Sequence, residues 1–179
     1  MADRGSHYEA SFEHVLREAA VPYVAVDEAK RALFGKAKLK GFDFLVYSRS
    51  GPNLLIDVKG RRTSGGRSVQ TWVTRRDVED LAQWERVFGD DFRAMLAFNF
   101  WIGDAEEEKG DQLPVAGVDP ADLPGEPGVL DFRGRRYRML GVGLEAYRNH
   151  MRERSAKWAT VAVPTADFRR LATPIGSWL

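Results

Sequence analysis

The stretches Phe42-Asp43-Phe44-Leu45-Val46-Tyr47 and Leu54-Leu55-Ile56-Asp57-Val58-Lys59 decide the fold that the sequence predicts. Both are rich in β-branched and aromatic residues, the residue types that favour β-strands. Residues 49–53 between them read Arg-Ser-Gly-Pro-Asn, a composition typical of a turn. The two stretches are therefore predicted to form an antiparallel hairpin.

Charged residues occupy the end of the second predicted strand. Asp57 and Lys59 are two positions apart, so their side chains project from one face, and the other face carries the apolar residues Leu54, Ile56 and Val58. A carboxylate and an ammonium group there are costly to bury unless they are paired, bound to a metal or solvated. Because the start of one hairpin strand lies beside the end of the other, we expect Asp43 to lie close to Asp57.

Two neighbouring carboxylates repel each other, and a hard divalent cation relieves that repulsion. Mg²⁺ typically takes one or two carboxylates together with water and phosphate oxygens. Asp43, Asp57 and Lys59 are therefore a chemically sensible set for hydrolysing phosphodiesters. The alternative is an ordinary solvated strand edge. The same spacing of an acidic residue and a lysine also occurs at Glu28-Ala29-Lys30 and Glu107-Glu108-Lys109. Of the three tripeptides, only the one at 57–59 lies at the end of an apolar predicted strand.

Helical patterns flank the hairpin. Residues 6–20 show apolar residues at helical spacing, with Ser6 as N-cap and Glu9 three positions later in a capping-box pattern. A second helix is predicted to begin at Thr74 and to end at Gly89. Residues 94–102 are almost wholly apolar and predict a strand that is buried on both faces. Together these elements predict an α/β domain with a mixed central sheet.

The region after residue 102 is less regular. Residues 103–128 are acidic and rich in Pro and Gly, which predicts a long surface loop. Residues 129–140 predict a hairpin around Gly134, and residues 158–163 predict a last strand. With 179 residues and no recognisable linker, the chain is expected to form a single domain, 1–179.

Basic residues concentrate around the predicted site. From residue 58 to residue 76 the sequence holds no acidic residue. A basic surface beside a metal is what a phosphate backbone requires, although a solvated loop would show the same composition. The candidate nucleic-acid-binding residues are Lys36, Lys38, Lys40, Arg61, Arg62, Arg67, Gln70, Arg75 and Arg76.

Composition excludes several classes of protein. The 27 basic and 26 acidic residues leave a net charge of +1, so bulk charge does not indicate nucleic-acid binding. The absence of cysteine excludes a disulfide scaffold, a thiolate metal site and cysteine catalysis. No apolar run reaches the ~18 residues of a membrane span, and the N-terminus shows no secretory signal. We expect a cytoplasmic protein without a membrane partner.

The motifs around Asp43 and around Asp57-Val58-Lys59 resemble those of the PD-(D/E)XK nuclease superfamily. In particular, residues 6–102 resemble the archaeal Holliday junction resolvase branch. That branch has an early helix carrying a Glu, here Glu9, and a later helix that opens with a basic residue followed by Arg-Asp, here residues 75–77. One departure is that Phe42 stands where the superfamily often has Pro. Residues 103–179 are not covered and would be an elaboration of the 6–102 nuclease-like core.

The resemblance implies a restriction-endonuclease-like core with a mixed central sheet flanked by helices. It implies that Asp43 and Asp57 bind Mg²⁺, for which Mn²⁺ can substitute, with the Val58 carbonyl as a possible third ligand. Glu9 would complete the site, directly or through water, and Lys59 would orient or activate the nucleophilic water. Glu13, one turn after Glu9, is the rival carboxylate, but it is expected to face solvent and to pair with Arg17.

These features together predict a Mg²⁺-dependent endodeoxyribonuclease, and selectivity for substrate structure is one form that this activity can take; RNA is not excluded as a substrate. The resemblance implies that the protein acts on DNA as a homodimer. Two alternatives stay open. The chain can be a non-catalytic nucleic-acid-binding or assembly module on the same fold. It can also be a protein-interaction domain that matches the motifs by accident.

Overall fold

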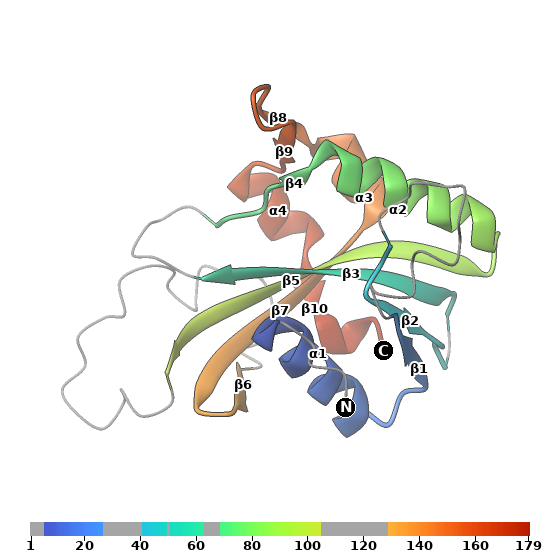
Figure 1. Ribbon diagram of the computed structural model, residues 1–179, viewed down its shortest axis with the longest axis vertical. Helices are drawn as coiled ribbons and strands as arrows, with labels where there is room; N and C mark the ends of the chain where they lie inside the picture. Colours follow the sequence, from blue (N-terminus) through green and yellow to red (C-terminus); the bar gives the residue numbers. More distant parts are fainter. Residues whose placement is uncertain (1–5, 27–40, 50, 63–68, 105–128) are drawn as a thin grey trace.

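The computed structural model describes residues 6–26, 41–49, 51–62, 69–104 and 129–179 (Figure 1). A mixed β-sheet crosses the molecule, with α1 (His7–Glu18) on one face. The opposite face is covered by α2 (Arg75–Phe88), α3 (Leu144–His150) and α4 (Thr165–Leu171). The predicted α/β architecture, with a mixed central sheet flanked by helices, is confirmed.

Seven strands form the main sheet in the described part of the chain. Their order is β1 (Tyr23–Ala25), β2 (Phe44–Val46), β3 (Asn53–Arg62), β5 (Phe92–Asp104), β7 (Arg135–Gly143) and β10 (Thr173–Pro174), with β6 (Val129–Phe132) also paired to β7. Only the β3–β5 pair is parallel, and α2 lies on its crossover connection. The predicted 42–59 hairpin is present as β2 and β3, with Phe44 opposite Ile56.

A second, three-stranded sheet stands beside the first. It joins β4 (Val73–Thr74), β9 (Thr160–Ala162) and β8 (Arg152–Ser155). The strand predicted at 158–163 therefore begins only at Thr160, and Trp158 lies in the turn before it. Strand β8 was not predicted because Arg-Glu-Arg-Ser lacks the apolar alternation by which a half-buried strand is recognised.

Helix α1 lies directly on the central strands. Ser6 caps the helix through a hydrogen bond that its Oγ accepts from the Tyr8 amide (3.3 Å), rather than through the predicted box with Glu9. A Cβ at Gly60 of β3 would lie 2.2 Å from the Tyr8 ring, so only glycine permits this approach. Asn99 Nδ2 of β5 donates to the Tyr8 carbonyl and to Ser11 Oγ, each at 2.8 Å. These contacts fix α1 on β3 and β5.

Helix α2 is tied to the opposite face through its own ends. Thr74 and Asp77 form a reciprocal capping box, and Gly89, with φ of 86°, ends the helix as predicted. Val78 and Leu81 are buried in the core on this side. The first turn of α2 is therefore held firmly beside β4.

Strand β5 continues past residue 102, the boundary drawn from sequence between the nuclease-like core and its elaboration. It pairs along most of its length with β7, which lies beyond that boundary. The C-terminal residues thus supply strands to the main sheet. Of the predicted 103–128 loop, residues 105–128 lie outside the described residues. In the described ranges, no helix has the length and apolar character needed to cross a membrane.

Candidate active site

The start of β2 places Asp43 against the backbone of β3. The Asp43 amide donates to the Ile56 carbonyl (2.8 Å), and Asp43 Oδ2 accepts a hydrogen bond from the Val58 amide (2.7 Å). Since Phe44 is paired with Ile56, Asp43 lies level with Asp57 on the neighbouring strand. The structure therefore brings together the two aspartates that the hairpin prediction placed side by side.

Asp57 and Lys59 are both buried and lie on the face of β3 that α2 covers. The two residues, 5% and 8% exposed, form an ion pair with 2.7 Å between Lys59 Nζ and Asp57 Oδ2. Leu54, Ile56 and Val58 pack into the core on the α1 side, as the two-residue alternation predicts. A buried charged pair at this position differs from the solvated strand edge considered as the alternative.

A second buried carboxylate, Asp77, contacts the same lysine. Asp77 Oδ1 lies 3.3 Å from Lys59 Nζ, while its Oδ2 accepts a hydrogen bond from the Thr74 amide (2.9 Å). The Lys59 ammonium is thus held by two carboxylates. Sequence reasoning gave Asp77 no role at the site. The sequence signal that could have identified Asp77 is the opening of the predicted helix, a basic residue followed by Arg-Asp.

The electrostatics of the site are dominated by crowding of negative charge. The pKa of Asp43 is raised to about 8, and burial is the largest cause. The negative charge of Asp57, and then that of Glu9, raise it as well. The hydrogen bond from the Val58 amide and the positive charge of Lys59 lower the pKa but do not cancel the rise. Glu9, on α1, therefore acts on Asp43 electrostatically. An added positive charge beside Asp43 would favour its ionised form.

The donor set fits a hard divalent cation through two carboxylates. Within the described ranges, no group of three or more His, Cys, Asp or Glu side chains is arranged to hold a metal ion, so Glu9 does not complete a three-carboxylate site in this structure. One or two carboxylates with water are nevertheless the usual protein ligands of Mg²⁺. The half-buried Asp43, destabilised as an anion, has the chemistry of such a ligand. The roles of Glu9 and of the Val58 carbonyl stay predictions.

Glu13, the rival carboxylate, is engaged elsewhere. Its Oε1 lies 3.0 Å from the Arg17 guanidinium, which confirms the predicted pair. The Tyr23 hydroxyl also donates to Glu13 Oε1 (2.8 Å), and Glu13 is only 8% exposed. The expectation that Glu13 faces solvent was therefore wrong, because β1 covers this side of α1.

The predicted nucleic-acid-binding residues are placed differently from one another. Arg61 is partly buried and stacks over the Trp72 ring (4.4 Å to its centroid) while donating to the Trp72 carbonyl, and burial lowers the pKa of its guanidinium. Arg62 is exposed over Trp101, with 4.6 Å to the ring centroid.

The other members of this set lie beyond Arg62. Gln70, Arg75 and Arg76 are exposed, and Arg75 and Arg76 form ion pairs with Glu153 (3.9 Å) and Asp80 (3.1 Å). Four candidates lie outside the described residues: Lys36, Lys38, Lys40 and Arg67.

Comparison with known proteins identifies the fold of the chain. No protein-family model matches the sequence, and no curated protein matches it significantly. The fold resembles that of Hjc, a Holliday junction resolvase from the archaeal hyperthermophile Archaeoglobus fulgidus, with a TM-score of 0.53, 13% identity and 96% of each chain covered. The fold is restriction-endonuclease-like. At this identity the likeness concerns the fold alone.

Proposed function

We propose that this protein is a metal-dependent endonuclease that hydrolyses phosphodiester bonds in DNA. The observation that carries the proposal is the group formed by Asp43 with the buried Asp57 and Lys59 where β2 runs beside β3. The resolvase-like fold supports it, because its structural neighbour Hjc is a Holliday junction resolvase. Membership of the PD-(D/E)XK superfamily is part of the same proposal.

In the proposed reaction each residue has a distinct task. Asp43 and Asp57 would hold Mg²⁺, or Mn²⁺ in its place. The bound cation supplies Lewis-acid polarisation of the scissile phosphate. Lys59 would donate hydrogen bonds toward the attacking water and offset the negative charge that builds in the transition state. Asp57 and Asp77 position the Lys59 ammonium for this task.

A second candidate function is a non-catalytic nucleic-acid-binding module. It is favoured by one observation, that the described residues hold no three-ligand acidic group. Against it stands the cost of holding the half-buried Asp43 beside the buried Asp57, which nucleic-acid binding alone does not require. Cleavage, rather than binding, therefore separates the two functions.

The decisive experiment compares wild type with Asp57→Asn on plasmid, single-stranded and four-way-junction DNA. Each substrate is incubated with Mg²⁺, Mn²⁺ or EDTA, and RNA counterparts are included. We expect cleavage by wild type only with a divalent ion, and a loss of at least roughly 100-fold in Asp57→Asn. Asp131→Asn, an exposed aspartate on β6, is the matched control and should cleave as wild type does.

Cleavage by Asp57→Asn at the wild-type rate would refute the site. Binding of DNA by wild type without cleavage under any condition would favour the non-catalytic module.

The homodimer that the resemblance implies is tested in the same preparation by sedimentation, with and without DNA. A monomer on DNA would limit each encounter to one strand cut.

A further inference from the structure

The β8–β9 hairpin adjoins the candidate active site. Strand β9 pairs with β4, placing Thr160 opposite Thr74, and the Arg75 amide donates to the Ala159 carbonyl (2.8 Å). Thr74 is the residue that caps α2 together with Asp77, which contacts Lys59. A strand of nucleic acid leaving the site past the first turn of α2 would therefore meet this hairpin.

The hairpin carries an excess of positive charge and an exposed aromatic ring. Its basic residues are Arg152, Arg154 and Lys157. Its one acidic residue, Glu153, lies 3.9 Å from the Arg75 guanidinium, so its charge is partly offset. Trp158, in the turn, is 70% exposed, and Lys157 Nζ lies 5.4 Å from its ring centroid. An indole is large and apolar, so leaving it in water is unfavourable unless a partner covers it.

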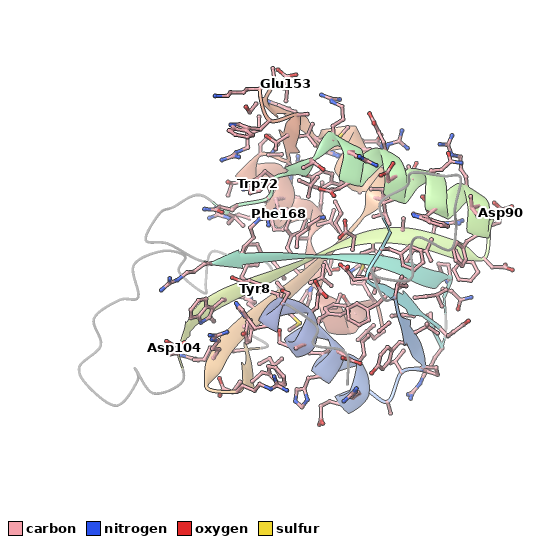
Figure 2. All side chains as sticks on the ribbon, viewed as in Figure 1. Tyr8, Trp72, Asp90, Asp104, Glu153 and Phe168 are labelled. Atoms are coloured by element: carbon pink, nitrogen blue, oxygen red, sulfur yellow. The ribbon has the colours of Figure 1, made fainter. Side chains whose placement is uncertain are left out.

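An open groove of about 340 Å³ lies at the base of the hairpin. Its lining includes Gln70, Trp72, Arg152 and Arg154. The Arg154 guanidinium is 5.3 Å from the centroid of the Trp72 ring, which Arg61 also contacts. Figure 2 shows Trp72 and Glu153 on the same side of the sheet. The groove thus combines guanidinium donors with a positioned aromatic ring.

We propose that the β8–β9 hairpin and this groove bind unpaired nucleotides of the DNA substrate. Arg152 and Arg154 contact phosphates, and Trp158 stacks on a base. An indole can stack only on a base whose face is free, which favours single-stranded or branched DNA over uninterrupted duplex. The positive charge favours this occupant over an apolar protein surface. The inference rests on the proposed function and extends it to the choice of substrate.

The test measures DNA binding in EDTA, where cleavage cannot interfere. Fluorescence anisotropy follows labelled single-stranded, four-way-junction and duplex DNA over a series of salt concentrations. Trp158→Ala should weaken binding to single-stranded and junction DNA roughly tenfold and duplex binding little, while Trp158→Phe retains most of the affinity. Arg152→Ala/Arg154→Ala should reduce the salt slope by about two.

The control is Arg86→Ala, which removes one exposed charge in the last turn of α2 and should bind as wild type does. Wild-type affinity in all hairpin variants, with DNA still bound and cleaved, would overturn the inference and leave the endonuclease standing. Absence of any DNA binding by wild type would overturn both. A Trp158→Ala change in sedimentation without a change in DNA affinity would show that the turn contacts protein, and would also overturn the inference.

Discussion

At the scale of single residues, the site depends on how charges are compensated. Lys59 has two carboxylate partners, Asp57 and Asp77, while Asp43 has a backbone amide and the opposing charge of the same lysine. The local balance is therefore negative around Asp43. A divalent cation would correct that balance, which is the physical link between the geometry and the proposed chemistry.

Asp77→Asn tests whether Lys59 is positioned by its second carboxylate. Asparagine can still accept from the Thr74 amide, so the helix cap survives while the ion pair to Lys59 is lost. We expect kcat to fall about tenfold with KM nearly unchanged, because the change acts on the transition state. Glu79→Gln, at an exposed position of the same helix, is the control. A fall in thermal stability with kcat unaltered would assign Asp77 a structural role only.

The raised pKa of Asp43 makes metal-free stability depend on pH. Below its ordinary value of 3.8 the Asp43 carboxyl is protonated in both folded and unfolded chains, and between 3.8 and about 8 only the folded chain keeps the proton. This contribution to stability is therefore lost as pH rises through about 8. In EDTA, Asp43→Asn should gain stability relative to wild type as pH rises from 3.8 to about 8, seen as a difference in Tm that grows across this range. A constant difference in Tm across this range would contradict the assignment.

At the scale of elements, the site is built where three elements meet. The β2–β3 hairpin supplies the aspartates and the lysine, α2 supplies Asp77, and α1 brings Glu9. The close approach of α1 depends on Gly60, over which the Tyr8 ring lies. The position of Glu9 is therefore set by a contact on the strand that carries Lys59.

Gly60→Ala is expected to displace α1. A Cβ there would come within 2.2 Å of the ring of Tyr8, and overpacking of this kind costs about 1–3 kcal/mol of unfolding free energy. Urea denaturation should show that loss, accompanied by reduced cleavage. Gly176→Ala, where an added Cβ meets nothing within 4 Å, is the control and should change stability by less than about 0.5 kcal/mol. Equal stability of the two variants would mean that Tyr8 moves aside freely.

At the scale of the whole molecule, the two cores lie on opposite faces of one sheet. Leu55 and Phe98 belong to the core under α2, while Ile56 and Met95 belong to the core under α1. Because the site lies on β3 between these cores, an ion bound there would stabilise the whole folded chain rather than one loop.

Thermal unfolding with Mg²⁺ or Mn²⁺ tests this linkage. At a free concentration near 100 Kd, binding to the folded chain alone adds about 2.7 kcal/mol, which corresponds to roughly 5–10 °C in Tm. Asp43→Asn and Asp57→Asn should lose most of that increase, whereas Asp131→Asn should retain it. An equal increase in all four proteins would indicate ion binding away from the site.

Local sequence patterns were sufficient to predict much of the fold and the proximity of the two aspartates in the site. The two-residue alternation of apolar side chains predicted which residues of β3 share a face, and the composition of residues 49–53 predicted the hairpin. The hairpin by itself places Asp43 beside Asp57. The N-terminal and C-terminal ends of α2 could also be predicted, because Thr74 and Gly89 cap the helix through contacts with residues close to them in the sequence. Such features depend on interactions within a few residues or across one turn.

Only the tertiary structure decided which distant groups meet. Asp77 reaches Lys59 because the crossover returns α2 over the face of β3, and no local pattern encodes that packing. Burial of Glu13 depended on β1, and β8 went unpredicted because a wholly polar strand has no apolar period. The sequence by itself therefore determined the hairpin and its charged end. Long-range packing decided the partners of those charges, because ion pairs and burial depend on elements that fold together from far along the chain.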